Sequence, residues 1–117
     1  MDTKARALTV VLIVDGNADT ALRLLADDYG VAKPRLKVGL PKGRRGNSLG
    51  CYDTKNRTIY VLNSDVMRQP FIILHEFYHH LRTNVDLKHR GTEKYADRFA
   101  KDFIQAYRLM VNEESSC

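Results

Sequence analysis

The order of hydrophobic patterns along this 117-residue chain predicts an α+β fold. One helix and several short β-branched segments occupy the first half, and helical spacing of apolar residues dominates from residue 66 onward. We therefore expect a small mixed β-sheet packed against two long C-terminal helices. No internal repeat or flexible linker divides the chain, so residues 1–117 are expected to form a single domain.

The composition is that of a globular protein, with 44% hydrophobic and 28% charged residues. The longest nearly unbroken apolar run covers residues 7–14, whereas a membrane span needs roughly 20 residues. No small-residue cleavage site follows this run, so we expect a cytoplasmic protein without membrane association. Cys51 and Cys117 lie far apart in the sequence, which argues against a structural disulfide.

The elements are expected in a definite order. Residues 8–14 are rich in β-branched side chains and favour a strand. Residues 18–29 carry apolar residues at helical spacing and end at Gly30, which is typical of a helix stop. After a loop over residues 41–50, two β-type segments at 51–53 and 58–62 flank a turn at Lys55 and Asn56, which predicts a hairpin.

Two long helices are expected to follow the hairpin. The first begins at Val66 or Pro70, where the spacing of apolar residues becomes helical, and continues through Leu81. The second begins at Thr92, a favourable N-cap residue, and runs to about Val111.

The first of these helices contains the sequence His-Glu-Phe-Tyr-His at residues 75–79, an HExxH motif. Two histidines one helical turn apart can chelate one zinc ion, and the intervening Glu76 then faces the bound water. At 100° per residue His75, Glu76 and His79 share one face of the helix, while apolar residues occupy the opposite face. His80 is expected on the flank, away from the ligands.

Catalytic zinc usually takes three protein ligands, and the second helix offers the third. Glu93 and Asp97 fall on its apolar side, where unpaired carboxylates would be costly to bury. We therefore expect Glu93 to bind the metal and Asp97 to accept the outward N–H of a ligating histidine. The alternatives are a Glu93 that only interacts with the helix dipole, and a three-histidine site completed by His89.

Four segments together resemble the ImmA/IrrE-type minimal gluzincin metallopeptidases. They are Gly-Cys-Tyr at 50–52, Thr-Ile-Tyr-Val-Leu-Asn at 58–63, His-Glu-Phe-Tyr-His-His at 75–80 and Glu-Lys-Tyr-Ala-Asp-Arg-Phe-Ala at 93–100. The resemblance implies a minimal zincin-like fold with one Zn²⁺ per chain. It also implies His75, His79 and Glu93 as zinc ligands and Glu76 as general base.

These observations predict a zinc metallopeptidase, and more narrowly an endopeptidase that acts on an intracellular protein or peptide. An oxyanion donor is also needed, and the sequence leaves Tyr95, His89 and Tyr52 as candidates. Residues 58–62 should lie nearest the HExxH helix and, if they form an edge strand, bind an extended peptide by strand addition. The residues of this expected substrate strand are Thr58, Ile59, Tyr60, Val61 and Leu62.

A second hypothesis is a noncatalytic, zinc-stabilised module that binds nucleic acid or a protein partner through a basic loop. Lys42, Arg44 and Arg45 lie in this loop, and the chain carries a net charge of +5 with a pI near 9.4. No aromatic residues interleave to stack on bases, which argues against nucleic acid. An intact Glu76 favours catalysis, because a structural zinc site gains nothing from a base. The sequence does not indicate an oligomeric state.

Overall fold

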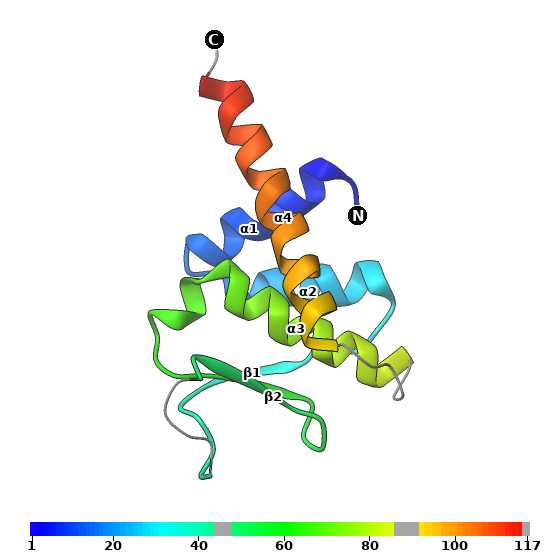
Figure 1. Cartoon of the computed structure of the whole chain (residues 1–117), viewed down its shortest axis with the longest axis vertical. Helices are drawn as coiled ribbons and strands as arrows, with labels where there is room; N and C mark the ends of the chain where they lie inside the picture. The colour runs from blue at the N-terminus through cyan, green and yellow to red at the C-terminus, as the bar shows by residue number, and fades with distance from the viewer. Residues whose placement is uncertain (44–47, 86–91, 116–117) are drawn as a thin grey trace.

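The computed structural model describes residues 1–43, 48–85 and 92–115, and this part of the chain has the predicted α+β architecture (Figure 1). Its helices are α1 (Thr3–Val14), α2 (Ala18–Tyr29), α3 (Pro70–Val85) and α4 (Thr92–Ser115). A short 3-10 helix, η1, covers Val66–Arg68. The strands are β1 (Arg35–Val38), β2 (Gly50–Asp53) and β3 (Thr58–Val61). The described helices lie on one side of the sheet (Figure 1).

The first apolar run is part of helix α1, so the strand predicted at residues 8–14 is wrong. Asp2 caps this helix, because its side chain accepts a hydrogen bond of 2.8 Å from the Ala5 N–H. The buried side chains of α1 follow helical spacing and are Ala7, Thr9, Val10 and Ile13. Packing against the other helices therefore overrides the strand preference of the valines.

The other predicted helices are confirmed. Gly30 ends α2 in the left-handed conformation with φ 70°, which glycine adopts without strain. Helix α3 starts at Pro70 and ends at Val85, one turn later than expected. Helix α4 starts at Thr92 as predicted and extends to Ser115, beyond the expected end near residue 111.

The sheet has the order β1-β3-β2, with β1 parallel and β2 antiparallel to β3. The predicted hairpin is confirmed, and Asp53 closes its turn by accepting hydrogen bonds from the Lys55 and Asn56 backbone N–H groups. Strand β3 is paired on both sides, so it has no free edge. The expectation that residues 58–62 capture a peptide by strand addition is therefore wrong. Strand β2 is the edge strand on this side of the described sheet.

Strand β2 lies directly against α3, so the expectation that residues 58–62 lie nearest this helix is wrong. A methyl group built at Gly50 would sit 2.8 Å from Ile72 Cγ2 and 3.6 Å from Glu76 Cγ, so only glycine allows this approach. Ile59 and Val61 of β3 are fully buried on the same side of the sheet. The largest buried apolar side chains of the core are Phe77, Phe103, Ile13, Leu22, Leu25, Ile73 and Leu74.

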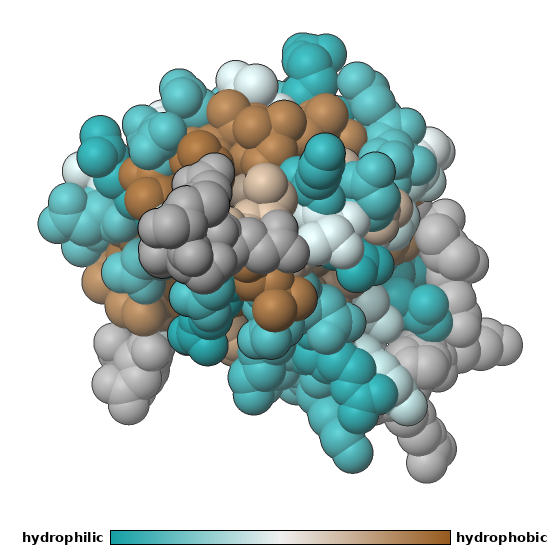
Figure 2. All heavy atoms as spheres, turned by 90° about the horizontal axis from the view of Figure 1, so that it is seen from above, coloured by the Kyte–Doolittle hydropathy of each residue, from teal (hydrophilic) through white to brown (hydrophobic). Residues whose placement is uncertain are grey.

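Apolar side chains also reach the surface of the helical layer, as the face in Figure 2 shows. A groove between α1 and α4 is lined by Lys4, Ala7, Leu8, Val11, Tyr107, Met110 and Val111. None of these residues belongs to the HExxH motif or its neighbours. Among the described helices, none is both long and apolar enough to cross a membrane.

Two adjacent residues test the burial pattern of α1. Ile13 is fully buried and Val14 is 42% exposed. Ile13→Ala should lower the free energy of unfolding by about 2–5 kcal/mol, because it leaves a core cavity. Val14→Ala should change it by only about 0.5 kcal/mol. Urea unfolding measures both, and equal losses would contradict the burial pattern.

Candidate metal centre

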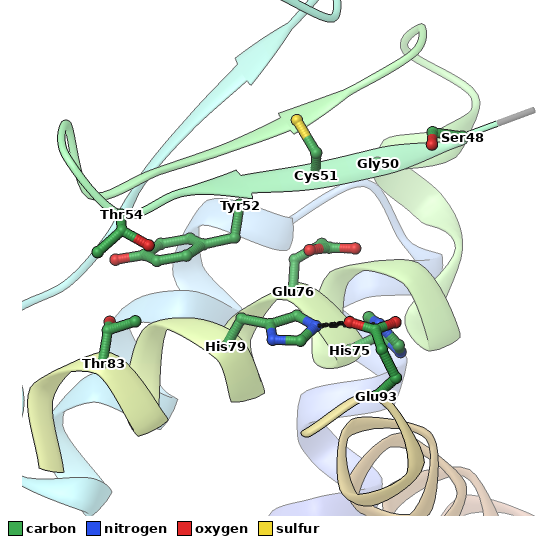
Figure 3. Close-up of a pocket in the computed structure, with 10 residues that line it drawn as sticks. All are labelled: Ser48, Gly50, Cys51, Tyr52, Thr54, His75, Glu76, His79, Thr83 and Glu93. Carbon is green, nitrogen blue, oxygen red and sulfur yellow. Dashed lines mark hydrogen bonds and ion pairs between the residues drawn. The ribbon is translucent and has the colours of Figure 1, made fainter. Parts of the chain in front are cut away.

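Helices α3 and α4 bring three potential metal ligands together. His75 and His79 lie one turn apart on α3, and Glu93 lies in the first turn of α4. The His75 Nε2 atom is 3.1 Å from Glu93 Oε2, and the His79 Nε2 atom is 2.7 Å from Glu93 Oε1. The two Nε2 atoms are 3.2 Å apart. All three donor atoms lie within 4.8 Å of one another, and Figure 3 shows their side chains converging.

The hydrogen bond of His75 to Asp97 leaves two acceptor atoms, His75 Nε2 and a Glu93 carboxylate oxygen, facing each other. Its Nδ1 lies 2.9 Å from Asp97 Oδ1, and the carboxylate can only accept, so Nδ1 carries the proton. In the neutral ring the Nε2 lone pair then points toward the Glu93 carboxylate. Such acceptors repel unless a proton or a cation lies between them. Three ligands about 2.0–2.1 Å from a tetrahedral zinc ion would be about 3.3 Å apart, close to the separations found. The three residues could therefore hold a metal ion, and their separations are compatible with zinc.

The electrostatic environment of His79 keeps its ring in the form that binds metals. Burial lowers the pKa of His79, and this effect outweighs the attraction of the Glu93 carboxylate, which acts in the opposite direction. The ring is therefore neutral at pH 7, with a lone pair available for coordination.

The two acidic residues of α4 lie where the sequence predicted but are not buried. The Glu93 side chain is 77% exposed and the Asp97 side chain 47% exposed, so the expected burial among apolar residues is wrong. Glu93 lies in the first turn of α4, at the edge of the helical layer. The cost of burying a charge therefore does not explain its position. The contacts of Glu93 with His75 and His79 explain its position. A favourable interaction of Glu93 with the helix dipole is compatible with these contacts.

The three ligands open onto a cleft of about 330 Å³ between α3 and β2 (Figure 3). Glu76 lines the same cleft and is 8% exposed, so the carboxylate of the HExxH motif is close to the ligands and largely shielded from solvent. The Cys51 sulfur points away from the ligands (Figure 3). The remaining residues that line the cleft are Ser48, Gly50, Cys51, Tyr52, Thr54 and Thr83.

Strand β2 presents unpaired backbone groups at its outer edge. The Leu62 N–H donates to the Leu49 carbonyl at 2.9 Å, which fixes the alternation of hydrogen bonds between β2 and β3. Gly50 and Tyr52 occupy the non-hydrogen-bonded positions of this ladder, opposite Val61 and Ile59. Their N–H and C=O groups consequently point away from β3. No described strand pairs with this edge.

The three candidate oxyanion donors differ in their position relative to the cleft. Tyr52 lines the cleft, but its hydroxyl lies 2.7 Å from His80 Nδ1. Tyr95 is 40% exposed on α4 beside Arg98 and does not line the cleft. His89, the alternative third ligand, lies outside the described residues, as does the pair Arg44 and Arg45 of the basic loop.

The sequence prediction missed His80. This residue is fully buried rather than on the flank of α3, and its Nε2 lies 2.7 Å from the Ala32 carbonyl oxygen. Because a carbonyl can only accept, Nε2 carries the proton, and Nδ1 accepts the Tyr52 hydroxyl proton. Burial lowers the pKa of His80 and raises that of Tyr52, which keeps both in these neutral forms. The sequence contains an indication that His80 is buried, because Ile73, Phe77 and His80 share one helical face.

The comparisons with known proteins do not assign this chain to a family. No family model matches the sequence, and neither a curated protein nor a solved structure matches the chain significantly. The functional inference therefore rests on the residues of the cleft.

Metal binding by variants tests the ligand set. His75→Ala and His79→Ala should abolish binding of zinc, and Glu93→Ala should weaken it severely, because each removes one donor. Asp97→Asn should weaken binding about 10- to 100-fold, since it removes the acceptor that orients His75. Competition with a chromophoric chelator measures these affinities.

The matched comparison is His89→Ala, which should leave the affinity unchanged. Loss of metal in His89→Ala, with retention in Glu93→Ala, would contradict the ligand set.

Proposed function

We propose that this protein is a zinc-dependent metallopeptidase that hydrolyses peptide bonds of a protein or peptide. The observation that carries the proposal is a largely buried Glu76 in the same cleft as the convergent donors of His75, His79 and Glu93. A structural zinc site has no use for such a carboxylate. The resemblance of the motifs to the ImmA/IrrE-type gluzincins supports the same activity, and we propose membership of that family.

Glu76, the two histidines and Asp97 have separate roles in this reaction. A zinc ion held there would lower the pKa of a bound water toward about 7 and polarise the scissile carbonyl. Glu76 accepts the proton of the attacking water on its carboxylate and passes it to the leaving amine nitrogen. His75 and His79 would hold the metal through Nε2, and Glu93 would hold it through its carboxylate. Asp97 keeps His75 in the required tautomer through the hydrogen bond to Nδ1.

We further propose that the substrate binds as an extended strand along β2. Gly50 and Tyr52 direct their unpaired backbone groups toward this edge, and both residues line the cleft. A peptide paired there would lie between β2 and the metal ligands of α3. Main-chain pairing of this kind gives affinity and register, and it suits cleavage within a chain, as in an endopeptidase.

The alternative is a noncatalytic module that binds nucleic acid or a partner through the basic loop. Arg44 and Arg45 of that loop lie outside the described residues, so this hypothesis stays a prediction from the sequence. The described residues of the cleft favour the peptidase.

Substitution of the proposed base tests the reaction directly. Glu76→Gln keeps the size and polarity of the side chain and touches no metal ligand. We expect it to bind zinc as tightly as the wild type and to lower kcat for casein hydrolysis by at least about 100-fold, the range for a general base. Equal loss of zinc in Glu76→Gln and His79→Ala would mean that Glu76 is a ligand rather than the base.

Strand addition predicts a period of two along the substrate. Successive N–H groups of an extended peptide point alternately toward and away from β2. In a peptide derived from a casein cleavage site, N-methylation at alternate residues should therefore lower kcat/KM about tenfold or more, and methylation between them much less. A uniform response along the peptide, measured by mass spectrometry, would reject this binding mode.

A further inference from the structure

His80 joins three separate parts of the molecule although it is not a proposed metal ligand. It follows His79 on α3, and its Nε2–H donates to the carbonyl of Ala32 in the connection between α2 and β1. Its Nδ1 accepts from the hydroxyl of Tyr52 on β2 at 2.7 Å. The two rings meet edge to face, with centroids 5.4 Å apart and an interplanar angle of 68°. Both ring nitrogens are thus used while the side chain is fully buried.

The partner of His80 packs against the core and also lines the cleft. Tyr52 lines the cleft with its side chain and directs its backbone N–H and C=O to the free edge of β2. The hydroxyl of Tyr52 points away from Glu76, toward the C-terminal half of α3 (Figure 3). A hydrogen bond at this hydroxyl therefore holds the residue whose backbone would pair with a substrate.

At the opposite end of β2 the strand packs closely against α3. At Gly50 the strand approaches α3 so closely that an added methyl group would meet Ile72 at 2.8 Å. At Gly50, steric contact limits how closely β2 can approach α3. At Tyr52, the hydrogen bond to His80 prevents β2 from moving away from α3. Together they fix the separation of the β2 edge from His75 and His79.

We propose that His80 is a positioning residue that acts through the Tyr52 hydroxyl to hold the edge of β2 at the distance from the metal ligands at which a peptide can pair. This inference rests on the proposed peptidase function. It concerns the binding and alignment of the substrate, not the affinity for the metal and not proton transfer. A histidine that only satisfied its own polar atoms in the core would not affect peptide affinity separately from stability.

Two hydroxamates separate these effects, because acetohydroxamate reaches only the metal and a peptidyl hydroxamate also pairs with β2. In the zinc-loaded protein, Tyr52→Phe should lower the affinity for the peptidyl hydroxamate about tenfold, which corresponds to about 1.4 kcal/mol. It should also lower kcat/KM for the casein peptide about tenfold. Affinities for zinc and for acetohydroxamate should stay unchanged. Tyr107→Phe, which removes a hydroxyl from α4 outside the cleft, serves as the control and should change none of these quantities.

A pair of His80 variants distinguishes its two hydrogen bonds. The amide of His80→Asn reaches the position of Nδ1 and can still accept from Tyr52, whereas that of His80→Gln reaches the position of Nε2 and can only replace the bond to Ala32. We expect His80→Gln to match the losses of Tyr52→Phe, with no further loss in the double variant, and His80→Asn to retain peptide affinity. Equal losses of peptidyl hydroxamate affinity in both His80 variants would overturn the proposal. Equal losses of affinity for the two hydroxamates would also overturn it.

Nitrogen NMR of the metal-free protein reads the contact without any activity. The Nε2–H tautomer of His80 should be seen in the wild type, and Tyr52→Phe should shift its Nδ1 resonance. An unshifted resonance would overturn the proposal whether or not the protein hydrolyses peptides. A wild type that binds zinc and peptidyl hydroxamate but cleaves no peptide would refute the proposed function, and the hydroxamate affinities would still decide the role of His80.

Discussion

The packing of α3 against the first turn of α4 is the constraint on which the candidate centre depends. It places Glu93 Oε atoms 2.7–3.1 Å from the Nε2 atoms of two histidines that α3 holds one turn apart. The aromatic contacts of Phe99 on α4 with Phe77 and Tyr78 on α3 lie between the same two helices and hold them together. Because the Asp97 carboxylate fixes the proton of His75 on Nδ1, the Nε2 lone pair of this ring faces the Glu93 carboxylate. A cation between these two groups would relieve their repulsion.

The second constraint is the short distance between β2 and α3. It creates a cleft with the ligands and Glu76 on one wall and an unpaired strand edge on the other. Gly50 permits the approach, and the hydrogen bond between the half-buried Tyr52 and the buried His80 connects the two walls. In the proposed function, α3 supplies the metal ligands and the base, and the edge of β2 binds the main chain of the substrate.

The sequence was most informative where local pattern and chemistry coincide. The HExxH spacing, the Gly30 stop, the Thr92 start and the hairpin all depend on neighbouring residues, and each is found in the structure. Residues 8–14 were misassigned because valines and isoleucines fit a strand or a buried helix face, and only tertiary packing decides. Strand order depends on long-range pairing, which is why the sequence left open whether residues 58–62 form an edge strand, and the structure places β3 in the centre of the sheet. His80 was missed because burial of a polar ring depends on partners such as Tyr52 and Ala32, 28 and 48 residues away.

The central claim is a zinc centre formed by two imidazoles and one carboxylate. X-ray absorption spectroscopy at the zinc edge of the purified, zinc-loaded protein tests it most directly. We expect two imidazole nitrogens at about 2.0–2.1 Å, with the remaining ligands oxygen at about 2.0–2.2 Å. A third imidazole would replace Glu93 by His89, and a sulfur ligand at about 2.3 Å would implicate a cysteine. Either result, or the absence of stoichiometric zinc, would contradict the proposed centre.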